Sequence, residues 1–392
     1  MNNYKLEELC EFIRNGASIK QFENAKGYPI TRIETIADSY INLERVGYAD
    51  IIDLSKYEDY LLNIGDILMS HINSEKHLGK TAIFENEDKK LIHGMNLLCI
   101  RPDKKLVSPK YLNYYFKSLA FKKQLPKITK KSVNQASFSV SDLKKLKCKI
   151  HSIESQKKIV KILDKSQELI DKRKKQIEEL DLLVKSKFIE MFGDPVKNQK
   201  KLAKVKLSEL GEWKTGGTPL RSKSEYYNGN IPWLSSGELN NKYCFKSNEM
   251  ITESAIIESA AKIIEVGSLL LGMYDTAALK STINMIECSC NQAIAYSKLN
   301  ENLVNTVYVY YCIQIGKEFY KSQQRGVRQK NLNLSMVKGL EILMPPLELQ
   351  NQFADFVKQV DKLKFEMEKS LKELEDNFNS LMQKAFKGEL FN

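Results

Sequence analysis

The sequence predicts an α+β protein built from two tandem homologous mixed α/β domains, each followed by a long helix. The two helices are expected to form an antiparallel coiled coil with pseudo-twofold symmetry. Three observations predict this fold: a length of 392 residues, which fits two or three domains better than one core, an internal duplication, and a heptad-like apolar pattern at the end of each copy. The predicted boundaries are 1–152 and 196–346 for the domains, and 153–195 and 347–392 for the helices.

The duplication is clearest where each long helix begins. VSDLKKLKCKIHSIESQKKIVKILDK, from residue 140, matches LSMVKGLEILMPPLELQNQFADFVKQ, from residue 334, with Gln156 paired with Gln350 and Ser141 with Ser335. Earlier in each copy, KLEELCEFIRNG matches KLSELGEWKTGG, and GDILMS matches GSLLLG. A period of about 200 residues is too long for a solenoid repeat. The chain therefore contains a duplicated domain.

Residues 1–150 and 203–345 have the short apolar runs of mixed α/β domains. Strands are expected at ITRIETI, GDILMS, KTAIFE and NLLCIR in the first copy, and at KIIEV, STINMIE and QAIAYSKL in the second. Two tyrosine-rich runs, YLNYYFKSLAFKKQ and VYVYYCIQIGKEFYKSQQ, are predicted helices. Their tyrosines are more typical of a core than of a platform for base stacking.

The last part of each copy is predicted to be a helix of about 35 residues, about 50 Å long. Pro345 and Pro346 fit the start of the second helix, Gly193 to Pro195 stop the first, and Gly388 stops the second. The helices are expected to pack on each other, with Arg173 and Lys364 as polar positions that could set the register; the alternative is that each packs only on its own domain. The predicted apolar seam consists of Ile159, Leu163, Ile170, Ile177, Leu180, Val184, Phe353, Val357, Val360, Met367, Leu371, Leu374, Phe378 and Leu381.

Positive charge is concentrated in one part of the chain. Residues 101–150 contain fourteen Lys or Arg and only two acidic residues, Asp103 and Asp142, which accounts for the whole net charge of +12. Such a field attracts polyanions, although a lysine-rich solvated surface is the plain alternative. Seven scattered cysteines fit reduced thiols. Without a signal peptide or a membrane-length apolar run, a cytoplasmic location and no membrane partner are expected.

Motifs of the common enzyme classes are missing from the sequence. There is no Asn/Asp-Pro-Pro-aromatic turn, no GxGxxG, no phosphate-binding GxxxxGK[ST] loop and no HExxH. The four histidines (His71, His77, His93, His151) and the Cys288/Cys290 pair lack the spacing of zinc ligands. No catalytic residue and no metal site are therefore predicted.

WKTGGTPLRSKSEYYNGNIPWLSSGEL, in the second copy, combines a tight turn with cationic and aromatic side chains. Arg221, Lys223 and Tyr226 are of the types that bind phosphates and base edges. The stretch is equally consistent with a surface turn for which Trp233 is the core anchor.

These motifs resemble those of the DNA specificity subunit of type I restriction-modification systems. The resemblance covers essentially the whole chain and includes the tandem layout, GGTP at 216–219, FIEMFGDP at 188–195, LMPPLELQ at 343–350 and LMQKAFKGEL at 381–390. It implies two target-recognition domains that read the halves of a bipartite, asymmetric double-stranded DNA site, with the coiled coil as a spacer. It further implies two methyltransferase (modification) subunits and restriction subunits as partners. S-adenosylmethionine, and ATP and Mg for restriction, would be bound by these partners, and this chain would bind no cofactor.

Loop position and donor type then predict which residues contact DNA. The first copy lacks GGTP, and the sequence alignment places Ser281-Thr282 opposite Gly79-Lys80. The predicted contacts are Ser70, His71, Asn73, Lys76, His77, Lys80, Lys127, Lys130, Lys131, Asn134 and Gln135 in the first domain, and Thr218, Arg221, Lys223, Tyr226, Tyr274, Lys280, Arg325, Arg328, Gln329, Lys330 and Asn331 in the second. The main alternative function is a coiled-coil protein-interaction scaffold without sequence-specific DNA binding. A self-contained methyltransferase or nuclease is disfavoured by the missing motifs.

Overall fold

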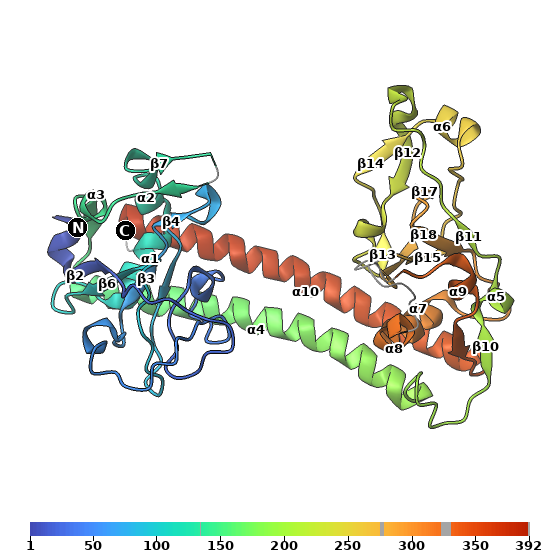
Figure 1. The fold of residues 1–392 in the computed structure, drawn as a ribbon, viewed down its shortest axis with the longest axis horizontal. Coiled ribbons are helices and arrows are strands. Elements are labelled where there is room, and N and C mark those ends of the chain that lie inside the picture. Colours follow the sequence, from blue (N-terminus) through green and yellow to red (C-terminus); the bar gives the residue numbers. More distant parts are fainter. Residues whose placement is uncertain (134, 275–277, 323–330, 391–392) are drawn as a thin grey trace. The chain divides into compact units, whose positions relative to one another are not determined.

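The computed structural model describes residues 1–133, 135–274, 278–322 and 331–390 (Figure 1). They form two compact units: unit 1 is Met1–Lys174 with Lys369–Asn392, and unit 2 is Lys175–Glu368. The predicted domain boundaries lie at the ends of the long helices, whereas the compact units divide both helices in the middle. Each unit therefore combines one mixed α/β domain with the first part of one helix and the last part of the other.

Unit 1 is built around a four-stranded antiparallel sheet in the order β2-β6-β3-β5. Unit 1 also contains the two-stranded sheet β1-β9 and the three-stranded sheet β4-β8-β7. The strands are β1 Asn2–Lys5, β2 Cys10–Asn15, β3 Ile67–Met69, β4 Ile72–Asn73, β5 Thr81–Ile83, β6 Leu98–Pro102, β7 Lys130–Lys131, β8 Ala136–Ser137 and β9 Lys147–Ile150; the short helices are α1 Pro109–Lys117, α2 Leu119–Lys122 and α3 Val140–Lys144.

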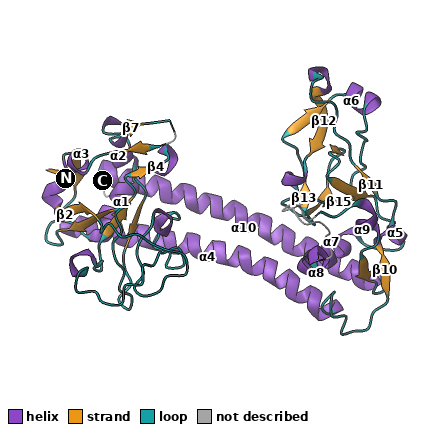
Figure 2. Cartoon of the chain, viewed as in Figure 1, coloured by secondary structure: helices purple, strands orange, loops and turns teal. Residues whose placement is uncertain are grey.

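Unit 2 has a five-stranded sheet in the order β11-β18-β15-β16-β13, a second sheet β14-β12-β17, and the pair β10-β19. Figure 2 shows these strands in orange and the helices in purple. The strands are β10 Lys204–Lys206, β11 Lys214–Thr215, β12 Tyr227–Leu234, β13 Tyr243–Cys244, β14 Glu249–Ile251, β15 Leu269–Gly272, β16 Ser281–Asn284, β17 Ser289–Cys290, β18 Ile294–Ser297 and β19 Glu341–Leu343; the short helices are α5 Leu207–Leu210, α6 Glu253–Glu258, α7 Thr306–Ile315, α8 Lys317–Ser322 and α9 Leu334–Lys338.

Most predicted strands and both tyrosine-rich helices are confirmed, and two strands are wrong. ITRIETI contains a 3-10 turn at Ile33–Ile36, in which the Thr35 hydroxyl accepts a hydrogen bond from the Arg32 amide (2.8 Å). Thr35 and Ile36 are buried at consecutive positions, which a strand with one solvent face would not allow. KIIEV contributes only an isolated bridge between Ile264 and Cys288.

The long helices are α4, Ile153–Phe192, and α10, Leu347–Lys387, and their predicted ends are confirmed. Gly193 (φ +78°) and Gly388 (φ +84°) directly follow them in the left-handed conformation that terminates helices. No helix in the described ranges is long and apolar enough to cross a membrane.

The two long helices pack against each other in opposite directions. In unit 1, Ile159 and Leu163 near the start of α4 share a core with Phe386 at the end of α10. In unit 2, Val184 near the end of α4 shares a core with Val357 near the start of α10. In both units the start of one helix packs against the end of the other, so the predicted antiparallel pair is confirmed. The alternative, in which each helix packs only on its own domain, is wrong.

The predicted seam residues are buried or half-buried. Polar residues flank the seam: Lys174 lies 2.9 Å from Glu375 in unit 1, and Lys364 donates to both carboxylate oxygens of Asp181 at 2.7 Å in unit 2. Buried seam residues are Ile159, Leu163, Ile170, Leu180, Val184, Phe353, Val357 and Val360; half-buried ones are Ile177, Met367, Leu371, Leu374, Phe378 and Leu381.

Candidate nucleic-acid interface

Unit 1 brings together two segments that the sequence analysis selected separately. β4, in the loop that follows β3, pairs with β8, so that Asn73 lies opposite Ala136. The Phe138 amide also donates a hydrogen bond to the His71 carbonyl (3.1 Å). The loop 70–80 and the lysine-bearing segment 127–135 are thus neighbours on one sheet, β4-β8-β7, and β4 and β7 lie close together in Figure 1.

Unit 2 repeats this arrangement with different side chains. Tyr274, after β15, forms a β-bridge with Asn331, and the Leu332 amide donates to the Met273 carbonyl (2.8 Å). The bond between Leu332 and Met273 corresponds to that between Phe138 and His71, and the Tyr274–Asn331 bridge corresponds to Ile72 opposite Ser137. The predicted contacts Asn134, Arg325, Arg328, Gln329 and Lys330 lie outside the described residues.

Backbone bonds correct the predicted alignment of the two loops. In unit 1 the Ser70 amide donates to the Lys80 carbonyl (2.9 Å), and in unit 2 the Gly272 amide donates to the Lys280 carbonyl (2.8 Å). Lys80 therefore corresponds to Lys280, and Ser281-Thr282 are not its counterpart. The two loops differ in length, which the sequence alignment missed because backbone bonding, rather than side-chain identity, sets the register.

Some predicted contacts in unit 1 are interior residues. Ser70 and His71 are 1% and 6% exposed. The Ser70 hydroxyl accepts a hydrogen bond from the Asn73 amide group (3.2 Å), and the His71 ring lies beside Phe138 with its Nδ1 atom unpaired. Burial lowers the pKa of His71. These two side chains support the loop from inside.

The other predicted contacts in unit 1 reach the surface. Lys76, Lys127, Lys130, Lys131 and Gln135 are exposed, and Lys131 forms an ion pair with Glu75 (2.7 Å). Residues of the loop 70–80 also line a pocket of about 330 Å³. Lys80 donates to the Ala37 carbonyl at its wall (2.6 Å). The pocket is lined by Ile33, Glu34, Ile36, Ala37, Asp38, Ser70, Asn73, His77 and Lys80.

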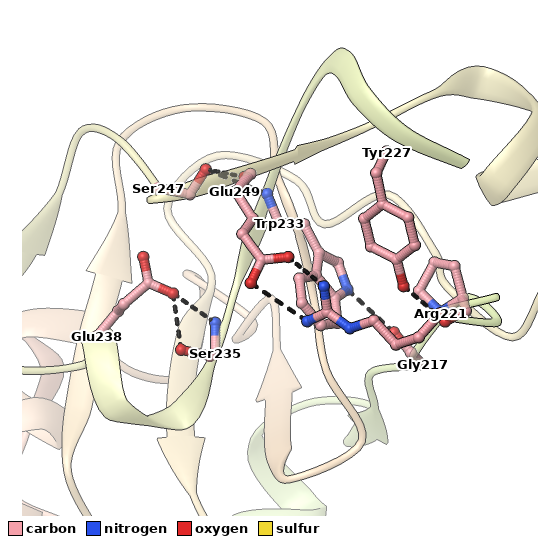
Figure 3. A network of polar contacts seen from close by, with 9 residues as sticks. Gly217, Arg221, Tyr227, Trp233, Ser235, Glu238, Ser247 and Glu249 are labelled. Atoms are coloured by element: carbon pink, nitrogen blue, oxygen red, sulfur yellow. Dashed lines mark hydrogen bonds and ion pairs between the residues drawn. The ribbon is translucent and has the colours of Figure 1, made fainter. Parts of the chain in front are cut away.

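In unit 2 the Gly-Gly-Thr-Pro turn is anchored from the interior, as Figure 3 shows. Trp233 is 2% exposed, and its Nε1 donates to the Gly217 carbonyl (3.0 Å). The Tyr227 hydroxyl donates to the Pro219 carbonyl (2.7 Å), and the Thr218 hydroxyl donates to the Gln292 side chain. A Cβ atom at Gly217 would collide with the Ala260 backbone, so this position requires glycine.

Arg221 extends from this turn and is held at the surface. Its guanidinium donates to both carboxylate oxygens of Glu249 (2.5 and 3.2 Å) and lies 4.7 Å from the Tyr227 ring centroid and 5.0 Å from that of Trp233. The hydrogen bonds that Arg221 donates to Glu249 raise the pKa of Arg221. The turn is thus both a structural anchor and the base of an exposed cation. Glu249 was missed because it lies 28 positions away, and no local signal links it to the turn.

The remaining predicted contacts in unit 2 are already paired. Tyr226 is 3% exposed and donates to Glu258 (2.7 Å), while Lys223 donates to the Tyr226 hydroxyl (2.8 Å). Lys280 donates to the Asn240 side chain (2.8 Å).

The surfaces described above present cations and amides. Across the described ranges, no cluster of three or more His, Cys, Asp or Glu is placed to hold a metal ion. Burial raises the pKa of Cys288 and of Cys148 to about 12, so these thiols stay protonated and are poor nucleophiles. Exposed lysines, amides and Arg221 can instead bind phosphates and base edges.

Comparison with known proteins places these features in a family. The model of the type I restriction modification DNA specificity domain matches residues 1–181 and 199–376. A putative type I restriction enzyme MjaX specificity subunit from Methanocaldococcus jannaschii is 31% identical, over 98% of this chain and 92% of the relative. A chain solved in a study of complex assembly and conformational transition of the type I R-M system has a TM-score of 0.63 at 15% identity, covering 99% of this chain and 98% of that one. The S subunit of a type I restriction-modification system from M. genitalium has a TM-score of 0.53 at 15% identity, and the match covers 98% of this chain and 96% of that one.

Proposed function

Because the chain belongs to the family of type I restriction-modification DNA specificity subunits, with two tandem recognition domains, we propose that each unit binds one half of a bipartite DNA site through the loops described above. Unit 1 would use the loop 70–80 together with the segment 127–135. Unit 2 would use Tyr274, Lys280, Asn331 and the segment 323–330. The alternative function, a protein-interaction scaffold that does not bind DNA sequence-specifically, is not supported by this family membership.

The pairing of the same two segments in both units carries this proposal. Asn73 opposite Ala136 in unit 1, and Tyr274 opposite Asn331 in unit 2, join a loop after a central strand to a segment more than fifty residues later. Two backbones held edge to edge give a surface broad enough to enter a groove. Asn73 and Gln135 on it can make paired hydrogen bonds to adenine, while lysines contact phosphates.

Partner subunits would supply the catalytic steps. We expect two methyltransferase subunits with S-adenosylmethionine, and restriction subunits with ATP and Mg, to assemble on this chain in the cytoplasm. This chain would contribute base recognition and the spacing between the half-sites. The antiparallel α4–α10 pair supports the spacing role because each helix contributes to the core of both units.

Methylation mapping tests the proposal directly. Genomic DNA exposed to the chain with its methyltransferase partner should carry methylated adenine within one bipartite motif with a fixed gap. The Arg328→Ala variant should relax one base position in one half-site, with a loss of about 10-fold, and leave the other half unchanged. Methylation of a single short motif, or of unrelated sequences, would contradict two-headed recognition. An unchanged pattern would refute only the role of Arg328.

A further inference from the structure

About half of the positive charge in residues 101–150 is used neither by the fold nor by the reading loops. Arg101 is paired with Asp66 (2.7 Å), Lys110 lies near Glu85 and Asp164, and Lys117 donates to the Ser39 carbonyl. Among the residues that the structure describes, no carboxylate lies within ion-pair distance of six other lysines. These six are Lys122, Lys123, Lys144, Lys145, Lys147 and Lys149.

The sheet β1-β9 places several of these lysines on one surface. Along β9, Lys147 and Lys149 are exposed while Cys148 and Ile150 are buried, so both lysines point outward. Lys147 lies directly opposite Lys5 of β1. Like charges at directly opposed positions destabilise a sheet. Glu7, 3.8 Å from Lys5, offsets this only weakly because both side chains are about half exposed.

Unit 2 has the opposite charge at the equivalent position. There β10 pairs with β19, and Lys206 lies opposite Glu341, where unit 1 has Lys5 opposite Lys147. Lys204 lies opposite Leu343, the counterpart of Lys149. The same small sheet therefore has a favourable cross-strand pair in one copy and a repulsive pair in the other. A bound anion would relieve the repulsion in unit 1.

This surface is continuous with the reading loop of unit 1. The side chain of Leu125 packs beneath Gly79 in the loop 70–80. The neighbouring Gln124 donates to the Lys147 carbonyl of β9 (3.0 Å) and so connects the exposed Lys122 and Lys123 to the sheet. We define the lysine face as Lys5, Lys122, Lys123, Lys145, Lys147 and Lys149.

We propose that the lysine face binds backbone phosphates of duplex DNA that extends beyond the half-site read by unit 1. This inference rests on the proposed function. Lysine ammonium groups suit it because they contact phosphates as point charges and require no base sequence. Unit 1 would hold the flanking duplex by charge, whereas the paired Lys206 and Glu341 would leave unit 2 without an equivalent contact.

The test measures DNA binding by the complex with the methyltransferase subunits over a series of salt concentrations. The double variant Lys147→Gln/Lys149→Gln should bind its cognate duplex more weakly, with a slope of log affinity against log salt that is smaller by about 2, at about 0.9 for each lost phosphate contact. The recognised sequence should not change. The matched control Lys204→Gln/Lys206→Gln removes the same charge from unit 2 and should leave the slope unchanged.

A single substitution separates binding from folding. Lys147→Glu recreates in unit 1 the Lys–Glu pair of unit 2, and should keep or raise the melting temperature while it weakens DNA binding. An unchanged salt slope in the Lys147→Gln/Lys149→Gln variant, or an equal loss in the control, would overturn the proposal. The proposal would also be overturned if the Lys147→Gln/Lys149→Gln variant no longer bound the methyltransferase subunits but kept the salt slope of DNA binding. That result would identify an acidic protein as the ligand of the lysine face. A wild-type complex without a bipartite motif would instead refute the proposed function.

Discussion

At the residue scale, Arg221 shows how a predicted DNA contact is held before DNA binds. Its partner Glu249 is 44% exposed and its own side chain 56% exposed, so the ion pair adds about 0–1 kcal/mol to stability. The carboxylate does, however, place a negative charge beside the guanidinium of Arg221. A phosphate or base edge must compete with Glu249 for the guanidinium.

Glu249→Gln should therefore strengthen DNA binding by the assembled complex. The amide keeps one acceptor for Arg221 and removes the charge that repels phosphate. The affinity should rise most at low salt, where unscreened charges interact most strongly. Glu253→Gln, which removes an exposed charge on the nearby helix α6, serves as the control. A weaker affinity for Glu249→Gln would show that the carboxylate positions Arg221 for recognition.

His93 makes the stability of unit 1 depend on pH. It is 1% exposed, its Nε2–H donates to the Leu97 carbonyl (2.8 Å), and burial lowers its pKa to about 4. The unfolded chain, with a histidine pKa near 6.5, binds the proton first as pH falls. The stabilisation is thus complete above about pH 6.5 and is lost towards pH 4, by up to about 3 kcal/mol.

His93→Gln should flatten this dependence, because glutamine retains a donor for the Leu97 carbonyl and does not titrate. Urea unfolding of both proteins at several pH values between 4 and 7 measures the effect. The wild-type advantage should shrink as pH falls. A constant difference across this range would show that His93 contributes packing alone.

At the element scale, one buried glutamine joins each long helix to its domain. The Gln156 side chain accepts a hydrogen bond from the Ser108 amide (2.8 Å) and donates to the His151 carbonyl (2.9 Å). Gln350 accepts from the Asn305 amide (2.9 Å) and donates to the Pro345 carbonyl (2.8 Å). Ser108 and Asn305 are the N-cap residues of α1 and α7. This shared role explains why the duplication keeps both glutamines.

Gln350→Met should destabilise unit 2, since methionine fills the space but leaves the Asn305 amide and the Pro345 carbonyl unpaired. Each buried group left unpaired costs about 1–3 kcal/mol. Gln352→Met, an exposed position on the same helix, should change the free energy of unfolding by less than about 0.5 kcal/mol. Denaturant unfolding measures the free energy of unfolding of both variants. Equal changes in the two would contradict the bridging role of Gln350.

At the scale of the whole molecule, the repeats in the sequence are not the folding units. The C-terminal part of α10 belongs to the second repeat, yet its Phe386 packs in unit 1 against Tyr111 and Tyr115, with ring centroids 5.3 and 5.5 Å apart. Conversely, Phe188 and Phe192 of the first repeat pack against Tyr308 of unit 2. Each copy therefore completes the core of the other.

Phe386→Ala should consequently destabilise unit 1, although the substitution lies in the second repeat. Phe386 is 5% exposed, and loss of its ring should cost about 3–5 kcal/mol. Hydrogen exchange should show lost protection in α1 and intact protection in α7. Phe365→Ala, 64% exposed on the same helix, should leave both unchanged. Loss of protection confined to α7 would contradict the exchange of helix ends.

Features that depend on local pattern follow from the amino-acid sequence alone. The duplication, the two long helices and their glycine stops, the tyrosine-rich helices and the family follow from periodicity and motifs. Local pattern could not assign Ile33–Ile36, because this 3-10 turn is rich in the β-branched residues that are typical of strands. It also could not show that Ser70, His71 and Tyr226 are interior residues, because polar side chains of the same type occur both at surfaces and inside hydrogen-bonded networks.

Contacts between distant residues, by contrast, follow from the folded chain and not from local pattern. The pairing of the loop 70–80 with 127–135, the bond between Arg221 and Glu249, the repulsion of Lys5 and Lys147, and the exchange of helix ends between repeats all join residues far apart in the chain. Such contacts arise because backbone hydrogen bonds and apolar burial are satisfied through space, and one sequence gives no measure of distance between positions that are not neighbours.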